Sequence, residues 1–132
     1  MPPRELSRPD LKPSANDVNL IINDFEQQLP GKNVDGYYRF TYGLEGNSEI
    51  PAHNQVHNWV GGIMKTMYSP TDPIFWLHHA EVDRLWHIWQ KKNPDLHPTL
   101  TGDDDIMDPW KETSAQLASI AVLGYSYESE SL

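Results

Sequence analysis

Residues 72–92 of the chain read DPIFWLHHAEVDRLWHIWQKK, and this stretch decides the fold. Aspartate followed by proline, here Asp72 and Pro73, is typical of a helix start. An aspartate side chain caps free N–H groups, and proline suits the first helical position. Asn93-Pro94 then ends the run, because the residue before a proline avoids the helical conformation. The stretch therefore predicts the longest helix of the chain, from Pro73 to about Lys92.

The segment before this helix predicts a second, shorter one over about residues 51–60. It ends at Gly61-Gly62, since glycine is favoured where a helix terminates. The connecting loop is short, so we expect the two helices to pack against each other in opposite directions. An antiparallel helix pair is therefore the predicted centre of the fold.

A further helix is predicted near the N-terminus. Ser14 opens a sequence resembling a capping box, and Pro30-Gly31 closes the run. Apolar residues follow Ser14 at helical spacing, namely Val18, Ile21, Ile22, Phe25 and Leu29.

The remaining segments give weaker patterns. Residues 31–50 carry alternating aromatic side chains over a few positions, which favours a short strand or an irregular loop. Thr113 or Ser114 begins a last short helix. We expect residues 1–13 to form an extended arm, because they hold four prolines, and residues 121–132 to form an irregular tail.

The length indicates one domain over residues 1–132, and the predicted helices make this domain mainly α-helical. A net charge of −9 without any basic run makes nucleic acids and anionic membranes poor partners. Cysteine is absent, which excludes disulfides, thiol nucleophiles and thiolate metal sites. The N-terminus lacks the apolar segment of a secretion signal, so the cytoplasm is the expected location.

The histidines are the candidate functional residues. His53 and His57 are four residues apart, so a helix places them one turn apart on one face. His79 follows early in the next helix, and three imidazoles without thiolate or carboxylate suit copper, zinc or iron. Two buried histidines bonded to the backbone are the alternative. Asn54 stands where a zinc protease of the H-E-x-x-H type needs its glutamate, which disfavours that chemistry.

A family resemblance extends over both histidine helices. Residues 53–62, HNQVHNWVGG, and residues 69–86, SPTDPIFWLHHAEVDRLW, closely resemble the copper-B half of tyrosinases. These are type 3 copper proteins, related to catechol oxidases and hemocyanins, and the likeness is greatest to short bacterial tyrosinases. It is strong over about residues 45–91 and looser to 127.

The resemblance implies a ligand set of His53, His57 and His79 for one copper ion. His78 is expected to point the other way, since consecutive helical residues point about 100° apart. Asp83, one turn after His79, is expected to accept a hydrogen bond from a ligand histidine, or else to pair with Arg84 or a nearby lysine. A site of His79, Asp83 and His87 on one helix is a less favoured reading.

The resemblance also implies residues that handle the phenol. Glu45 and Asn54 occupy the positions whose side chains hold a proton-accepting water in bacterial tyrosinases, and the alternative is that both are merely solvated. Met67 falls in the loop that lines the entrance in relatives, or is an ordinary loop methionine. Tyr125-Ser126-Tyr127 resembles the closing Tyr-x-Tyr motif of the family.

The family's chemistry uses two copper ions and six histidines, and one chain supplies half of this. No histidine precedes His53, and the remaining ones are His78, His87 and His97. We expect a homodimer in which two such helix pairs form a four-helix bundle around the metals. The chain contains five Trp, six Tyr and three Phe, and aromatic side chains are enriched at protein interfaces. Met1 is followed by a polar arm, which favours a complete chain over a fragment. A separate copper-A subunit, a fragment and a single-copper protein are the alternatives.

The expected activity is the O₂-dependent o-hydroxylation of monophenols and the oxidation of o-diphenols to o-quinones. One copper per chain, two per active site, is implied. Catechol oxidation alone, an O₂ carrier, and a copper-binding protein without turnover are the alternative functions.

Overall fold

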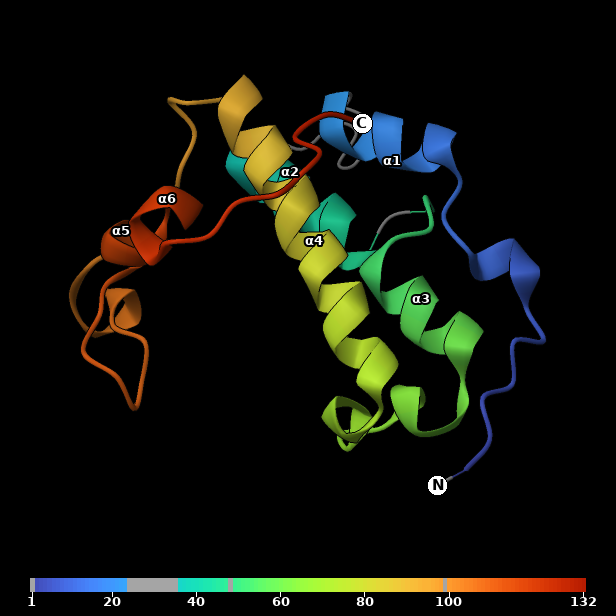
Figure 1. Cartoon of the computed structure of the whole chain (residues 1–132). Coiled ribbons are helices and arrows are strands. Elements are labelled where there is room, and N and C mark those ends of the chain that lie inside the picture. Colours follow the sequence, from blue (N-terminus) through green and yellow to red (C-terminus); the bar gives the residue numbers. More distant parts are fainter. Residues whose placement is uncertain (1, 24–35, 48, 99) are drawn as a thin grey trace.

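A computed structural model of the chain describes residues 2–23, 36–47, 49–98 and 100–132 (Figure 1). This part of the chain is mainly helical, as predicted, and contains no strand beyond an isolated bridge between Ile106 and Thr113. Among these residues, no helix combines the length and the apolar character needed to cross a membrane. The α-helices are α1 (Ala15–Asn23), α2 (Gly36–Glu45), α3 (His53–Val60), α4 (Pro73–Lys92), α5 (Ser114–Leu117) and α6 (Ile120–Leu123).

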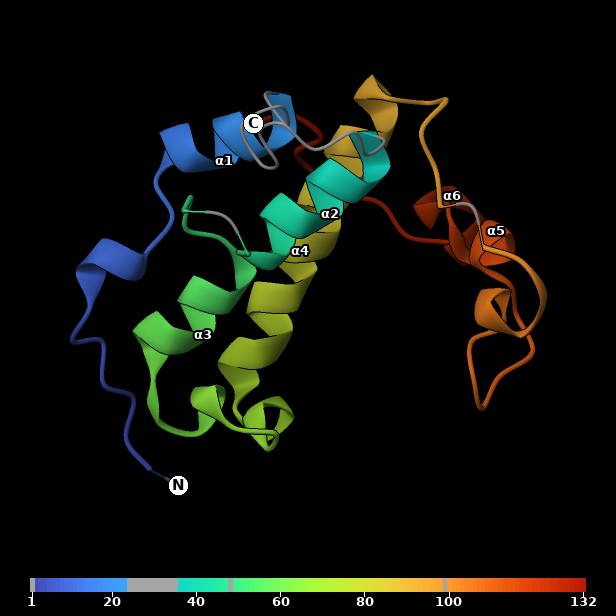
Figure 2. The ribbon, with the colours of Figure 1, turned by 180° about the vertical axis from the view of Figure 1, so that it is seen from behind.

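The predicted pair of α3 and α4 forms the centre of the molecule. The two helices lie side by side and run in opposite directions in both views (Figures 1 and 2). The Asp72 side chain accepts a hydrogen bond from the Ile74 N–H at 3.0 Å, so α4 begins with the predicted cap. Three short 3₁₀ turns, Pro9–Leu11, Gly62–Lys65 and Ser69–Thr71, shape the arm and the connecting loop.

Helix α2 corrects the expectation of a strand or loop over residues 31–50, which is wrong for Gly36–Glu45. Phe40 and Leu44 are four residues apart and both are buried, so a helix turns them to one face. The Phe40 ring stacks on Trp89 of α4 with centroids 4.2 Å apart. Tyr37 meets the Trp86 ring edge-on at 5.8 Å. Packing on the tryptophans of α4 therefore outweighs the local preference of aromatic residues for strands.

The core lies between α1, α2 and α4. Two of the predicted apolar positions of α1 are buried in it, Ile21 and Ile22, whereas Phe25 and Leu29 fall outside the described residues. The core side chains are Ile21, Ile22, Phe40, Leu44, Ala52, Leu85, Ile88 and Trp89. This core fixes α4 in place and leaves its first turns free to face α3.

The N-terminal arm packs along the end of α3 and the following loop. Arg4 donates two hydrogen bonds to the buried Asp72 carboxylate, at 2.6 and 3.1 Å. The Glu5 N–H donates to the Val60 carbonyl at 2.8 Å, and the Glu5 carboxylate accepts from Lys65 at 2.7 Å. The arm therefore ties the start of the chain to both ends of the loop between α3 and α4.

Gly61 and Gly62 make this packing possible. Both have positive φ, +70° and +56°, which disfavours other residues. A Cβ atom on Gly62 would lie 2.5 Å from the Pro3 carbonyl oxygen. The two glycines thus end α3, as predicted, and their lack of a side chain lets the N-terminal arm pack against the backbone there.

The C-terminal part forms two short helices and a tail. The predicted last helix is α5, in which Thr113 caps the Gln116 N–H. Helix α6 was not expected, and the tail after it returns along α4 (Figure 1). Gly124 ends α6 in the left-handed conformation.

We predict that Arg4 stabilises the fold through Asp72. Arg4→Gln leaves a buried carboxylate with only a backbone partner, so we expect the melting temperature to fall by roughly 5 °C. Arg8→Gln is the matched control, because it removes an ion pair of the same kind with Asp10 between side chains about 60% exposed. Thermal unfolding followed by circular dichroism measures both, and equal shifts in the two variants contradict the prediction.

Candidate metal centre

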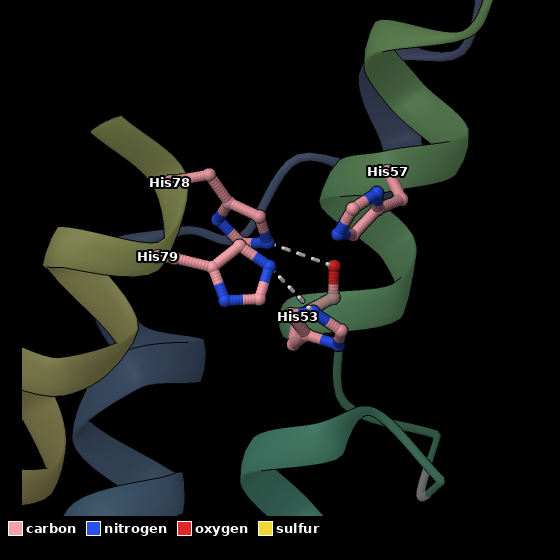
Figure 3. Close-up of side chains that lie close together, drawn as sticks. All are labelled: His53, His57, His78 and His79. Carbon is pink, nitrogen blue, oxygen red and sulfur yellow. Dashed lines mark hydrogen bonds between the residues drawn. The ribbon is translucent and has the colours of Figure 1, made fainter. Parts of the chain in front are cut away.

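Four histidines from α3 and α4 converge on one point. His53 and His57 project from consecutive turns of α3, and His78 and His79 reach across from the second turn of α4 (Figure 3). Each offers one ring nitrogen, and these nitrogens all lie within 4.8 Å of one another. The structure thus brings together the three predicted ligands His53, His57 and His79.

Hydrogen bonds fix the orientation of the two α3 rings. The His57 Nδ1–H donates to the Met64 carbonyl oxygen at 2.7 Å, which leaves Nε2 with its lone pair free. The His53 Nδ1–H donates to the Asn54 Oδ1 at 3.1 Å, so its Nε2 carries no proton and can accept from the His79 Nε2, 3.3 Å away. These are the partners that orient ligand histidines in metal sites.

The α4 ring of His79 is held by an aromatic neighbour. The Phe75 ring stacks on it with centroids 4.1 Å apart and meets His57 edge-on at 6.0 Å. Phe75 lies one turn before His79 on the same face of α4, which explains the contact.

The donor set fits a metal ion. The Nε2 atoms of His53 and His79 lie 3.3 Å apart. Two nitrogens bound at about 2.0 Å to one tetrahedral ion are about 3.3 Å apart. Imidazole nitrogens suit copper, zinc, iron or nickel. The cluster therefore matches the ligand chemistry predicted from the sequence.

Burial lowers the pKa of three of the four rings, those of His53, His78 and His79. Desolvation, followed by repulsion from the other three histidines, lowers the pKa of His78 to about 4. Desolvation is also the largest cause that lowers the pKa of His53 and of His79. A neutral imidazole is the form that binds a metal, so the rings are ready to bind at neutral pH.

His78 corrects the expectation that it points away. Its ring stacks on that of His53 with centroids 5.1 Å apart, and its Nε2 lies 3.2 Å from the His53 carbonyl oxygen. The Cβ atoms of adjacent helical residues point about 100° apart, but an imidazole extends far enough from the backbone for both rings to reach α3.

Glu45 and Asn54 both lie beside His53. The Glu45 Oε1 is 3.6 Å, and the Asn54 Oδ1 3.1 Å, from the same His53 Nδ1. Glu45 is the last residue of α2 rather than part of a loop, and its side chain is 53% exposed. Their role with the phenol stays a prediction, but both oxygens are on one side of one ligand.

An open hollow of about 410 Å³ reaches two of the histidines, His53 and His57. Its lining consists of His53, Asn54, His57, Asn58, Met64 and Lys65. Met67, predicted at the entrance, is 96% exposed and is not among these residues. The neighbouring Met64 lines the hollow instead, and its backbone carbonyl, which no sequence pattern reveals, holds His57.

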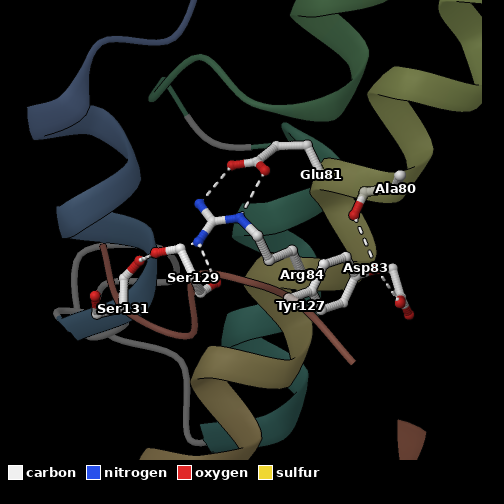
Figure 4. Close-up of polar contacts among 7 residues, drawn as sticks. All are labelled: Ala80, Glu81, Asp83, Arg84, Tyr127, Ser129 and Ser131. Atoms are coloured by element: carbon white, nitrogen blue, oxygen red, sulfur yellow. Dashed lines mark hydrogen bonds and ion pairs between the residues drawn. The ribbon is translucent and has the colours of Figure 1, made fainter. Parts of the chain in front are cut away.

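Asp83 binds the C-terminal tail. Its Oδ2 accepts hydrogen bonds from the hydroxyls of Tyr125, at 2.7 Å, and Tyr127, at 2.5 Å. The Tyr127 hydroxyl also lies 3.1 Å from the Ala80 carbonyl (Figure 4). The role of Asp83 toward a ligand histidine stays a prediction, while its contacts join the Tyr-x-Tyr motif to α4, the helix that carries His78 and His79.

Other residues of α4 hold the rest of the tail. Arg84 pairs with Glu81 of its own helix, at 2.8 Å, and donates to the Ser129 and Ser131 carbonyls (Figure 4). Lys91 and His87 face the Glu130 carboxylate at 2.6 and 3.5 Å. Neither Arg84 nor His87 is therefore directed at the histidine cluster.

Comparison with known proteins supports the reading of the cluster. The family described as the common central domain of tyrosinase matches residues 2–92. A tyrosinase of Streptomyces glaucescens is 47% identical over 78 residues, which are 54% of this chain and 28% of that protein. Tyrosinase HcTyr1 of Hahella sp. is 35% identical over 94 residues, 64% of this chain and 20% of that protein. Hemocyanin 1 of Megathura crenulata is 54% identical over 43 residues, 29% of this chain and 1% of that protein. The chain spans less than a third of the length of these relatives.

We predict that the tail detaches at high pH. Burial, then the hydrogen bond to Asp83, raises the pKa of Tyr125 to about 12, and the same causes raise the pKa of Tyr127 further. A folded-state pKa above the ordinary value near 10 means that this stabilisation is present below pH 10 and is lost as the pH rises toward 12. Titration of the phenolate absorbance measures the two pKa values.

Asp83→Asn tests the cause of these shifts. It removes the negative charge beside both hydroxyls, so both tyrosines are expected to ionise at lower pH than in the wild-type chain. Asp103→Asn, in the exposed turn Gly102–Asp105, is the control for loss of one negative charge. An unchanged titration in Asp83→Asn contradicts the assignment.

Proposed function

Since the chain belongs to the tyrosinase family, we propose that it oxidises phenols with O₂ by means of copper held at the histidine cluster. The observation that carries the proposal is the convergence of His53, His57 and His79, with Nδ1 hydrogen bonds that leave the Nε2 atoms of both α3 rings unprotonated. Bound copper supplies one-electron redox chemistry and a binding place for O₂. The substrates are monophenols and o-diphenols, and the products are o-quinones.

The openness of the site favours an enzyme over an O₂ carrier. The hollow of about 410 Å³ reaches His53 and His57, so we propose that a phenol approaches the cluster beside these two rings. The similarity to a hemocyanin fragment makes an O₂ carrier the second candidate. Such a carrier differs mainly in shielding its metals from phenols, and nothing among the described residues covers this hollow.

Glu45 and Asn54 are proposed to take the phenol proton. A monophenol must lose its hydroxyl proton to become a good metal ligand and nucleophile. A water held between the two side-chain oxygens, beside His53, can accept that proton and pass it to the Glu45 carboxylate. A catechol oxidase lacking this step is the narrower alternative.

The second copper is proposed to come from a second copy of the chain. Within the described residues, the four histidines are the single cluster able to hold a metal. Next to it, α4 and the loop before it expose large apolar side chains: Met67, Tyr68, Trp76 and Leu77 are 96%, 72%, 61% and 69% exposed. Exposed apolar groups of this size are typical of protein interfaces. A two-fold axis through this face would bring two histidine clusters together.

Copper content, mass in solution and turnover test the proposal together. The copper-loaded chain is expected to be a dimer with one copper per chain and to convert L-DOPA to coloured dopachrome. Leu77→Glu places a charge in the proposed interface and is expected to yield monomers and to abolish turnover, whereas Leu123→Glu on α6 is the matched control.

Each contrary result identifies an alternative. A monomer that binds copper without turnover supports a copper-binding protein. Turnover that appears only after a different subunit is added supports a heterodimer. A monomer that turns over by itself contradicts the shared site.

We predict that Glu45 contributes to the hydroxylation of monophenols and much less to the oxidation of catechols. Glu45→Gln removes the proton acceptor but keeps the size of the side chain, so monophenol hydroxylation is expected to fall on the order of 100-fold. Catechol oxidation should stay within a few-fold of wild type. Glu49→Gln, an exposed carboxylate four residues later, is the control.

Asn54→Ala is expected to act more broadly, because Asn54 also orients His53. It should weaken copper binding and lower both activities, with the larger loss on monophenols. Equal losses on both substrates in Glu45→Gln would refute the proton relay.

A further inference from the structure

A second cavity lies where the C-terminal part of the chain packs beside α4. Its volume is about 380 Å³, which is within the range of small-molecule sites. Its wall comes from α4, α2, the loop before α5, the two short helices and the tail. In both views α5 and α6 lie on the side of α4 that is remote from α3 (Figures 1 and 2). The cavity shares no lining residue with the hollow at the histidine cluster.

Three aromatic rings from three different elements form part of the wall. They belong to Tyr37 of α2, Trp86 of α4 and Tyr125 of the tail. Tyr37 meets Trp86 edge-on, with ring centroids 5.8 Å apart. Leu117 and Ile120 add aliphatic surface from α5 and α6. The faces of tryptophan and tyrosine rings attract cations and also cover apolar groups, so this wall suits a ligand that has both.

The polar groups of the cavity are able to accept hydrogen bonds. The Asp83 Oδ2 accepts both hydroxyls of the Tyr-x-Tyr motif, whereas within the described residues no group donates to its Oδ1. The Gln90 Nε2 donates to the Ala118 carbonyl at 2.9 Å, which leaves the Gln90 carbonyl oxygen as an acceptor. The Ser114 hydroxyl donates to Asp105, so its oxygen can also accept. The cavity therefore suits a hydrogen-bond donor.

The charge of the cavity is negative. Among the described residues, Asp83 is the one charged side chain in the lining. Burial, followed by the hydrogen bond to Asp83, raises the pKa of Tyr125 to about 12, so this hydroxyl is a neutral donor at neutral pH. The whole chain carries a net charge of −9, which attracts cations and repels anions.

We propose that this cavity binds a protonated arylalkylamine. Its ammonium group donates to the Asp83 Oδ1, and its aromatic body lies against the rings and the aliphatic side chains of the wall. A charge-assisted hydrogen bond to the carboxylate and the attraction of the aromatic faces offset the loss of water around the ammonium. The site uses no histidine of the cluster and no metal, so it is independent of the proposed function.

The order of residues along α4 sets the orientation of the ligand. Asp83, Trp86 and Gln90 are three and four residues apart, so the helix presents them on one face. An ammonium group at Asp83 places the body of the ligand one turn further on, at Trp86. Gln90 lies two turns, about 10 Å, from Asp83 and closes the far end. Met107, Leu123 and Tyr125 are each more than 40% exposed and leave an entrance from solvent.

Calorimetry with 2-phenylethylamine and 2-phenylethanol tests the proposal on the full chain. The two ligands share one carbon skeleton, but only the amine is charged at neutral pH. The amine is expected to bind about 10-fold more tightly than the alcohol, because a hydrogen bond between ions is stronger than a neutral one. Equal affinities of the wild-type chain for the two ligands overturn the proposal, and this comparison needs no variant.

Asp83→Asn tests the role of the carboxylate. Asparagine still accepts hydrogen bonds from the tyrosine hydroxyls but lacks the charge, so the amine should bind this variant no more tightly than the alcohol does. Asp103→Asn, in the exposed turn Gly102–Asp105, removes the same charge elsewhere and is expected to bind the amine as the wild-type chain does. Unchanged amine affinity in Asp83→Asn contradicts the proposal.

NMR spectroscopy tests the location of the ligand. Nuclear Overhauser effects are expected between the phenyl ring of the amine and the methyl groups of Leu117 and Ile120. Leu117→Trp narrows the cavity without changing its charge and should weaken the binding of both ligands on the order of 10-fold. Contacts of the amine with the histidine cluster, in place of these methyl groups, overturn the proposal and leave the proposed function intact.

Discussion

The metal centre depends on a fixed turn between α3 and α4, and the buried Asp72 carboxylate holds that turn. Asp72 starts α4 by capping Ile74, which sets where the first turns of the helix point. The same carboxylate binds Arg4 and so draws the N-terminal arm across the loop. Glu5 then contacts Gly62 and Lys65, on either side of Met64, whose carbonyl orients His57. A charge nearly excluded from solvent thus links the chain's first residues to the geometry of a ligand.

The helix pair also resolves an electrostatic problem. Four histidines this close together cannot all be protonated at once, since each positively charged ring would repel the others. Burial and this repulsion lower the pKa of three of them, and hydrogen bonds from Nδ1 direct two free lone pairs inward. The His53 and His79 Nε2 atoms lie 3.3 Å apart, so either a ring proton or a metal cation has to lie between them. The folded chain is therefore prepared for a metal before one is bound.

Local signals in the sequence predicted the elements that carry the site. Asp72-Pro73 and Asn93-Pro94 predicted where α4 begins and approximately where it ends, and the spacing of His53 and His57 predicted their common face. Helix α2 could not be predicted in this way, because its aromatic residues favour strands locally and become helical through packing on Trp86 and Trp89.

The site shows the same division between local and long-range information. The ligands followed from a family pattern, but the partner of His57 is a backbone carbonyl and has no sequence signal. The inward turn of His78 depends on how closely α3 approaches α4, a distance that helical angles alone do not give. Asp83 was recognised as important, yet its tyrosine partners lie over 40 residues away and come near only through the path of the tail.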